Sequence, residues 1–511
     1  MRHSANSKSS HRSPRKRSRI AGPRRLREIK GFDIGLDTWQ EPVPYDPARD
    51  LGPYLARRAA GKAVRGRVPR EAHAQWQAPA DRPDPVSVLL ATNEGRIPEL
   101  IPLRMARMAE SPFGFLRGSA AVMAWDLAHM PATGMPVVLD GDAHLSNFGL
   151  FGSPQREVLF DLSDFDETAV GSWEWDLKRL VASVAVVARE NHYPAGKRRR
   201  AVHDCVRAYR TTAARLQDMG VMDVWYQHAF PGAKHSLVQW ELKSHSIFKQ
   251  AARHAEKNNS ARMLPRVARR GKNGLWKFVA DPPILTLVDK DTAAAVEASL
   301  GEYAKTLTPE RRFMMNRYRV GDVAHRVVGV GSVGTRCYLV MLFGAGERDP
   351  LFLQVKEALR PALANDKTAI SAGADPEGRR VVLGQRFLQA SSDVLLGWTT
   401  IVGRPFYVRH MRDMKGSIEL HDLVWPAFHS YVWSCGALLA RAHARTGDVA
   451  KIAGYCGNSD VLDNALADFA EAYADQTEQD HEALVKAIKQ KRVKAARLKS
   501  KKRGKVFEEQ S

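Results

Sequence analysis

Acidic and amide side chains gather after a short apolar run at residues 137–139, which the sequence predicts to be a buried strand. The polar loop that follows reads G-D-x-H-x-x-N and contains Gly141, Asp142, His144 and Asn147. A carboxylate can accept the proton of an attacking hydroxyl, and an amide oxygen five residues on can reach a magnesium ion held against phosphate. We therefore take Asp142 and His144 as candidate catalytic residues.

A second acidic cluster follows the next apolar run, residues 158–160, which is also expected to be a strand. Its carboxylates belong to Asp161, Asp164 and Asp166. Carboxylates at strand ends commonly hold a divalent cation, so Asp164 and Asp166, with Asn147, are the candidate metal ligands. The sequence leaves open whether Asp161 or Asp164 is the ligand. A polar hairpin that only caps turns is the alternative, but two clusters about one hairpin apart favour a site.

A third motif, GVGSVG, contains Gly329, Gly331, Ser332 and Gly334, and a strand, a turn and Lys356 follow it. No helix is expected after these glycines, which argues against a Rossmann dinucleotide site. Between strands the motif is similar to the kinase loop that covers the phosphates of ATP, with Lys356 in the position of the phosphate-pairing lysine. A glycine-rich hairpin beside an ordinary solvated lysine is the alternative.

Together the three motifs resemble those of the protein-kinase-like and aminoglycoside-phosphotransferase superfamily, which suggests ATP and Mg²⁺ as cofactors. The resemblance implies that Asp142 is the base, that Asn147 and Asp164 bind the metal, and that Asp176 braces the loop. One departure is Asp140, which stands where that superfamily has histidine before Gly-Asp.

The order of the motifs differs from that of kinases, because the glycines and the lysine come about 190 residues after the catalytic loop. Either the chain is circularly permuted, or the resemblance of one half is accidental. The helix expected to end at 438–448 (LLARAHARTGD) resembles the helix that precedes the catalytic loop in kinases, which favours permutation.

Several further stretches are similar to an uncharacterised bacterial family, domain-of-unknown-function family 2252, over roughly residues 85–485. They include SPFGFLRG, GDAHLSNFG, FDLSDFDET, WEWDLKRL, GQRFLQASSDVLLGW, YVRHMRDMKGS and LARAHARTGD, in the family's order. That family carries no settled activity, so this resemblance implies kinship more than chemistry.

The expected fold is α+β and protein-kinase-like, with a helical lobe at 86–317, a sheet lobe at 318–420 and a helical segment at 421–485. Apolar spacing predicts helices at 98–110, 119–130, 173–189, 197–219, 422–445 and from 459 onward. Runs rich in β-branched residues predict about five antiparallel strands after residue 318, including 379–389 and 404–411. A tail at 1–30, an extended arm at 31–85 and a tail at 486–511 complete the chain.

The net charge of +22 belongs to the two ends of the chain. Residues 1–30 carry +10 and residues 486–505 carry +11, which leaves about +1 for the remainder. Such tails should be disordered and should bind polyanions only weakly and without sequence preference. Arg409, Arg412 and Lys415 could hold an anionic substrate, but a solvated basic sheet edge is the favoured interpretation.

Four scattered cysteines fit buried thiols in a reducing compartment. The apolar runs are too short to span a bilayer, and no secretory signal is visible, so a cytoplasmic protein without membrane insertion is expected. The leading hypothesis is an ATP- and Mg²⁺-dependent phosphotransferase acting on an unknown hydroxyl of a small molecule or protein. The alternatives are a metal-dependent phosphoesterase and a non-catalytic protein that binds nucleotide or nucleic acid.

Overall fold

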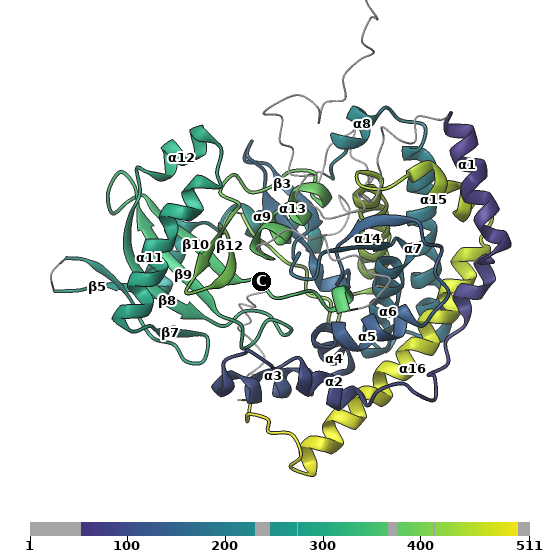
Figure 1. The fold of residues 1–511 in the computed structure, drawn as a ribbon, viewed down its shortest axis with the longest axis horizontal. Coiled ribbons are helices and arrows are strands. Elements are labelled where there is room, and N and C mark those ends of the chain that lie inside the picture. Colours follow the sequence, from purple (N-terminus) through teal and green to yellow (C-terminus); the bar gives the residue numbers. More distant parts are fainter. Residues whose placement is uncertain (1–52, 230–245, 273, 366–376, 412–413, 499–511) are drawn as a thin grey trace, which may run out of the picture. The chain divides into compact units, whose positions relative to one another are not determined.

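The computed structural model describes residues 53–229, 246–272, 274–365, 377–411 and 414–498. All of them belong to one compact unit, Thr38–Ser511, and the other unit, Met1–Asp37, lies outside the described residues. The predicted tail at 1–30, residues 499–511 of the second tail and Arg412 also lie outside them. The described chain is a mixed α+β fold with one large antiparallel sheet and a mainly helical part (Figure 1), as predicted.

The large sheet has six antiparallel strands in the order β11-β12-β10-β9-β8-β7. Its strands are β7 (Leu285–Leu287), β8 (Arg319–Arg326), β9 (Cys337–Phe343), β10 (Pro350–Glu357), β11 (Gly397–Ile401) and β12 (Arg404–His410). The sequence predicted an antiparallel sheet here, but β7 and β11 were not predicted. The glycine motif connects β8 to β9, between strands as expected.

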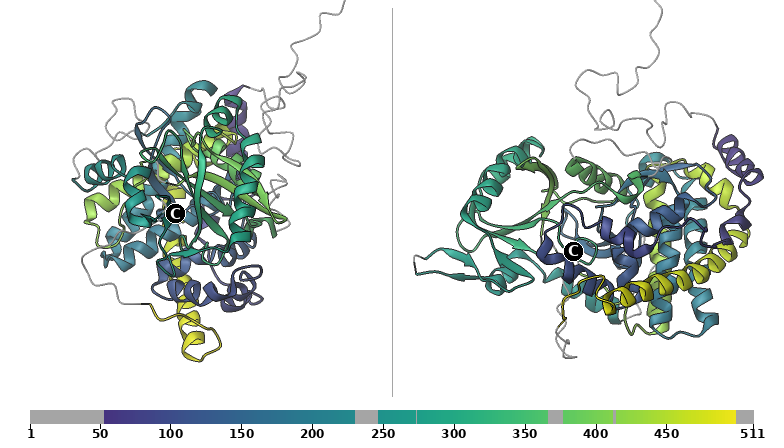
Figure 2. Two further views of the ribbon diagram at one scale, coloured as in Figure 1. Left: turned by 90° about the vertical axis from the view of Figure 1, so that its left-hand side faces the viewer. Right: turned by 60° about the horizontal axis from the view of Figure 1, so that its bottom comes forward.

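Both faces of the sheet are buried, which explains why β9 is an almost continuous apolar run. Val340 and Leu342 of β9 pack with α11 (Lys290–Lys305), whereas Leu339 and Met341 pack toward α10 (Ser260–Val267) on the opposite face. Because side chains alternate along a strand, Lys356 of β10 lies on the face opposite α11. This face turns toward the helical part (Figures 1 and 2).

The strand predicted at 379–389 is wrong, because these residues form helix α13 (Glu377–Leu388). The helix is buried on nearly all sides, and its continuous apolar run, residues 381–383, cannot be distinguished from a buried strand by sequence pattern alone. A Cβ at Gly378 would lie 2.2 Å from the Phe406 carbonyl oxygen, and one at Gly384 would lie 2.4 Å from the side chain of Thr168. These glycines therefore allow α13 to pack closely between β12 and the loop after β3.

The helical part is built around four long helices that share one apolar core: α6 (Glu174–Glu190), α7 (Ala195–Leu216), α14 (Trp425–Ala444) and α16 (Val461–Lys489). All four were predicted. Pro426 lies in the first turn of α14, where its missing N–H has no intrahelical acceptor to lose. Asp463 lies in the first turn of α16 and Lys489 in its last, which favours both helix ends electrostatically. Figure 2 shows α16 running along this part.

Two small hairpin-like pairs carry the acidic clusters on this helical core. β1 (Pro136–Leu139) pairs with β4 (Ala169–Ser172), and β2 (Phe148–Gly152) pairs with β3 (Val158–Leu162). The predicted strands at 137–139 and 158–160 are thus confirmed, while β2 and β4 were not predicted. The segment before β1 forms α2 (Pro85–Ala91), α3 (Ile101–Met108), α4 (Pro112–Gly118) and α5 (Ala120–Ala128).

Among the described residues, five further α-helices and one hairpin complete these two parts. They are α1 (Tyr54–Ala63), α8 (Val221–Trp225), α9 (Ser246–Glu256), α12 (Pro309–Met315), α15 (Val449–Cys456) and the hairpin β5 (Ala268–Arg270)–β6 (Trp276–Phe278). All four cysteines are free and buried, as predicted. Within the described ranges, no helix is both long enough and apolar enough to cross a bilayer.

Candidate functional site

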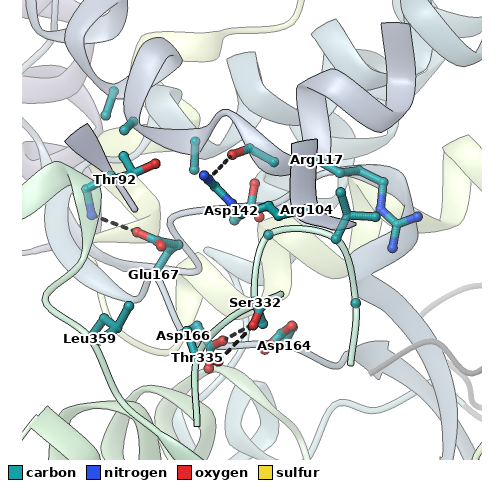
Figure 3. Close-up of a pocket in the computed structure, with 18 of the residues that line it drawn as sticks. Thr92, Arg104, Arg117, Asp142, Asp164, Asp166, Glu167, Ser332, Thr335 and Leu359 are labelled. Atoms are coloured by element: carbon teal, nitrogen blue, oxygen red, sulfur yellow. Dashed lines mark hydrogen bonds between the residues drawn. The ribbon is translucent and has the colours of Figure 1, made fainter. Parts of the chain in front are cut away.

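One cavity of about 590 Å³ brings most of the predicted site residues together (Figure 3). Those that line it are Asp142, His144, Asn147, Asp164, Asp166, Gly329, Gly331 and Ser332. Lys356 lies behind Asp164 and Asp166, and neither it nor Gly334 lines the cavity. The three motifs therefore meet, although they come from distant parts of the sequence.

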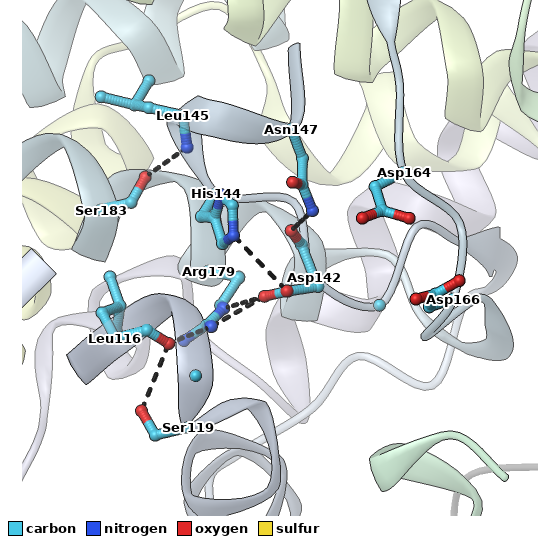
Figure 4. A network of polar contacts seen from close by, with 12 residues as sticks. Leu116, Ser119, Asp142, His144, Leu145, Asn147, Asp164, Asp166, Arg179 and Ser183 are labelled. Atoms are coloured by element: carbon cyan, nitrogen blue, oxygen red, sulfur yellow. Dashed lines mark hydrogen bonds and ion pairs between the residues drawn. The ribbon is translucent and has the colours of Figure 1, made fainter. Parts of the chain in front are cut away.

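Asp142 is fixed from the helical side of the cavity (Figure 4). Arg179 of α6 donates to its Oδ1 from Nε at 2.9 Å and from Nη2 at 2.7 Å, and Nη2 also donates to the carbonyl oxygen of Leu116. Burial raises the pKa of Asp142 to about 7, although Arg179 acts against this rise. The carboxylate is thus oriented and has a pKa suited to a general base at neutral pH.

His144 faces the other oxygen of the same carboxylate. Its Nε2 lies 3.5 Å from Oδ2 of Asp142, and its ring packs edge-on against Phe113. Burial, together with the positive charges of Arg117 and Arg179, lowers the pKa of His144 well below its ordinary value. At neutral pH the imidazole is therefore uncharged and helps to enclose Asp142.

The turn before Asp142 is held by a carboxylate of α6. Asp176 accepts from the backbone N–H of Asp140 at 2.8 Å and from that of Gly141 at 3.0 Å, and His443 of α14 contacts the same carboxylate at 3.2 Å. Gly141 has φ 81°, and a Cβ there would lie 2.0 Å from the carbonyl oxygen of Glu167, so only glycine is accommodated.

Asp140 occupies the position before this turn and is fully buried. Neither of its carboxylate oxygens has a hydrogen-bond partner. Burial, and then the nearby charge of Asp176, raises the pKa of Asp140 well above its ordinary value. The turn is therefore braced through the backbone of Asp140, which Asp176 binds, and not through the Asp140 side chain.

Asn147, Asp164 and Asp166 carry the oxygens that could hold a cation. The Nδ2 of Asn147 donates to the carbonyl oxygen of Asp142 at 2.8 Å, which leaves its Oδ1 available (Figure 4). The Oδ1 atoms of Asp164 and Asp166 are buried without a hydrogen-bond partner. Such oxygens fit Mg²⁺, which binds through one or two carboxylates and substrate phosphates. Among the described residues, no group of three or more His, Cys, Asp or Glu could hold a metal by itself.

Lys356 joins the sheet to the second acidic cluster. Its Nζ forms an ion pair with Asp166 and lies 3.8 Å from Oδ1 of Asp164, and the lysine is fully buried. Burial acts to lower the pKa of Lys356, but Asp164 and Asp166 raise it above its ordinary value. For Asp166, burial acts in the opposite sense, and Lys356 lowers the pKa below its ordinary value. Both partners are therefore charged at neutral pH.

The glycine motif lies over this acidic cluster. Ser332 Oγ donates to Oδ2 of Asp166 at 3.2 Å (Figure 3). Arg96 donates from Nη1 to the carbonyl oxygens of Gly331 at 2.9 Å and Val333 at 2.8 Å. The N–H of Ile97 donates to the Gly334 carbonyl oxygen at 2.7 Å. The segment before α3 therefore holds the glycine motif above the second cluster.

Asp161 lies in a different environment from Asp164. It is buried and forms an ion pair with Arg441 of α14, and its carboxylate also accepts from the N–H of Ala390 at 3.0 Å. Asp161 does not line the cavity. Of the two candidate ligands that the sequence left open, Asp164 is thus the one that faces the site.

The favoured interpretation of Arg409 as part of a solvated edge is wrong. Arg409 exposes 4% of its surface, donates to Gln354 at 2.6 Å and to the Ser163 carbonyl oxygen at 3.1 Å, and lies in β12, which is paired on both sides. The missed strand β11 is the actual edge of the sheet. Arg409 therefore ties the sheet to the loop before Asp164.

Several charged residues at or beside the cavity were not assigned a role from the sequence. Among them are Arg179, Glu167, Glu357 and Arg380. Arg179 follows Asp176 by one helical turn, so an i, i+3 pairing on α6 would have indicated a shared face. Arg380 donates to the carbonyl oxygens of Asp166 and Thr168 at 2.9 and 2.6 Å, but it could not be placed because its helix was predicted as a strand.

The protein therefore has a mixed α+β fold. Its candidate site consists of one cavity with an acidic loop, a glycine segment and a lysine that forms an ion pair with the acidic residues. Residues 96–487 match the model of a family described as "Uncharacterized protein conserved in bacteria (DUF2252)", and the chain belongs to this family. This finding confirms the family resemblance of the sequence motifs. No curated protein and no solved structure matches the chain.

Proposed function

We propose that the protein is an ATP- and Mg²⁺-dependent phosphotransferase with a circularly permuted, kinase-like fold. The observation that carries this proposal is the contact of Lys356 with Asp164 and Asp166, two carboxylates that line the same cavity as Asp142 and the glycine segment. A phosphate-pairing lysine, metal-binding carboxylates, a phosphate-covering loop and a base are the parts that phosphoryl transfer uses.

The order of elements around the lysine supports the kinase-like fold. The glycine segment lies between β8 and β9, and Lys356 is on β10, the third strand counted from β8, as the phosphate-pairing lysine of kinases is on their third strand. Helix α13 follows β10. Kinase lysines pair with a glutamate of the corresponding helix. Here Glu377 of α13 binds Arg380, and Lys356 pairs with Asp164 and Asp166.

The contact between α14 and β1 supports permutation. The N–H of Val138 donates to Thr446 Oγ1 at 3.2 Å, and a Cβ at Gly447 would lie 3.1 Å from the carbonyl oxygen of Pro136. The end of α14 therefore lies beside the strand that leads into the Asp142 loop. Connecting these two points would give sheet, helix and catalytic loop in the order that kinases have.

Each residue has one role in this proposal. The glycine segment binds and orients the phosphates, and Lys356, behind the cavity wall, positions Asp164 and Asp166. With Asn147, these carboxylates would hold Mg²⁺, which supplies neutralisation of phosphate charge. Asp142 takes the proton of the acceptor hydroxyl as the hydroxyl oxygen attacks the γ-phosphorus. ADP leaves as the bond between the γ-phosphorus and the bridging oxygen breaks.

The test is Mg²⁺-dependent turnover of ATP, measured as slow release of phosphate to water by purified protein. Asp142→Asn should lower the rate by about 10²–10⁴-fold, because the base is lost. Asp463→Asn is the control, since Asp463 is a buried carboxylate bound to Arg210 outside the cavity. Equal rates for wild type and Asp142→Asn would remove Asp142 from the mechanism.

A further inference from the structure

Two neighbouring arginines line the cavity without a carboxylate partner. Arg96 donates only to carbonyl oxygens, those of Thr92, Gly331 and Val333. Arg104, labelled in Figure 3, donates from Nη2 to the Gly118 carbonyl oxygen at 3.0 Å. Its Nη1 donates to Asn93 Oδ1 at 2.7 Å. Within the described part of the chain, neither guanidinium forms an ion pair.

Because Arg104 is buried, the lack of a carboxylate partner is energetically unfavourable. It exposes 2% of its surface, and its Nε is buried without a hydrogen-bond partner. Burial, and then the positive charge of Arg96, lowers the pKa of Arg104 to about 9. A buried charge without a counter-charge is unfavourable, so an anion bound in the cavity would stabilise this pair of arginines.

Two other arginines that are largely shielded from solvent have a carboxylate counter-charge. Arg210 donates to Asp463 at 2.6 Å, and Arg82 donates to Asp126 at 2.7 Å. Glu167 is the acid whose charge acts on both Arg96 and Arg104, but its carboxylate accepts from the N–H of Ala362 at 2.7 Å and pairs with neither arginine. The cavity pair therefore differs from Arg82 and Arg210, whose charges are balanced by carboxylates.

The position of Arg104 relates it to the candidate base. Arg104 binds the carbonyl oxygen of Gly118, and Arg179, which holds Asp142, binds that of Leu116, two residues earlier in α4. Both Arg104 and Asp142 line the cavity. The wall beside them consists of small or apolar side chains, which leave room for a ligand: Val88, Ala91, Ala120, Ala121, Ala124 and Trp125.

We propose that Arg96 and Arg104 form an anion subsite, and that the molecule phosphorylated beside Asp142 carries a phosphate or carboxylate group in addition to its hydroxyl. The assignment of the anion to the acceptor rests on the proposed function, whereas the subsite itself does not. Planar guanidinium groups bind both kinds of anion well. The cavity volume of about 590 Å³ is in the range of small-molecule sites.

The experiment is calorimetric titration of the full chain with inorganic phosphate or with acetate, at an ionic strength matched with KCl. Asn93→Asp places a carboxylate on Nη1 of Arg104 without changing the side-chain shape. It should weaken phosphate binding by about tenfold or more, because the arginine is then neutralised internally. Asn464→Asp, whose side chain accepts from Arg199 on an exposed helix face, is the matched control and should bind as wild type does.

A second variant and a second ligand keep the outcomes separate. Arg104→Gln should also lose phosphate binding, and unchanged binding in both Asn93→Asp and Arg104→Gln would overturn the subsite. The titration is repeated with Mg²⁺ and a non-hydrolysable ATP analogue present, where phosphate should still bind. Competition by the analogue would assign the anion to the nucleotide and overturn the acceptor assignment. Failure of the analogue to bind, with phosphate binding still dependent on Asn93, would overturn the proposed function and leave the subsite intact.

Discussion

The two sides of the cavity differ in how far apart along the sequence their contacting residues lie. On one side, Asp142 is held by Arg179, which is 37 residues away, and its loop is held by Asp176, which lies 35 residues from Gly141. On the other side, Ser332 reaches Asp166 across 166 residues, and Lys356 is still more distant along the chain. Asp142, the proposed base, is thus fixed within one helical part, whereas the ion pair of Lys356 forms only where the sheet packs against that part.

Because of this difference, substitutions on the two sides of the cavity should have different effects. Substitutions on the Asp142 side should change the chemistry of a site that otherwise remains assembled. Substitutions on the Lys356 side should change both nucleotide binding and the free energy of unfolding, because the same charges join the sheet to the helical part. The following substitutions test this separation.

Lys356→Met should have the largest effect on stability. Removing the buried ammonium leaves Asp164 and Asp166 without their counter-charge, which should lower the free energy of unfolding by about 3–5 kcal/mol in urea at pH 7. Lys277→Met is the control, since Lys277 is exposed and pairs with Asp322 at 2.9 Å, and it should cost less than about 1 kcal/mol. Similar losses in the two variants would show that the lysine does not join the two parts.

Asp176→Asn should have an intermediate effect. An amide can accept from one of the two backbone N–H groups of Asp140 and Gly141, but its own N–H₂ faces the other, so we expect a loss of about 1–3 kcal/mol. Turnover should fall because the turn before Asp142 loosens. Asp475→Asn, an exposed partner of Arg189, is the control for a changed carboxylate. A loss no larger than that of the control would argue against Asp176 as the brace of the loop.

Ser332→Ala should have the smallest effect. It removes one hydroxyl donor at 3.2 Å from Asp166, while Lys356 still pairs with that carboxylate, so the expected loss is about 0.5–1.5 kcal/mol. Ser87→Ala removes a comparable hydroxyl donor to Asp84 at an exposed helix end. Its loss should be below that of Ser332→Ala, and the reverse order would mean that the glycine segment is not held by Asp166.

The acidic clusters could be predicted because each follows a short apolar run, and such runs can be recognised as strands from the sequence. The structure confirms those strands and places Asp142, Asn147, Asp164 and Asp166 around one cavity. The glycine segment was also found, because no helix-forming stretch follows it. These features depend on residues that are close together in the chain, and the spacing of apolar residues in the sequence identifies such local features well.

The remaining features depend on which residues are buried in the folded protein, and this cannot be read from the sequence. Helix α13 was predicted as a strand because its buried surface extends around the helix and two glycines interrupt its pattern. Arg104 lies in a correctly predicted helical stretch, 98–110, but its proposed role depends on its having no carboxylate partner among the described residues, which only the three-dimensional structure reveals. Arg409 was expected at a solvated edge because the covering strand β11 was not predicted.

The most direct test of the division between the two sides is a pair of Mg-ATP titrations, with binding measured by calorimetry and by the shift in melting temperature. At a hundredfold excess over Kd, Mg-ATP should stabilise wild type by about 2.7 kcal/mol. Asp142→Asn should bind Mg-ATP as wild type does, because the base acts on the acceptor hydroxyl. Asp164→Asn should lose the Mg²⁺-dependent binding, because a metal-binding charge is removed. Equal binding by both variants, or loss of binding in both, would contradict the account.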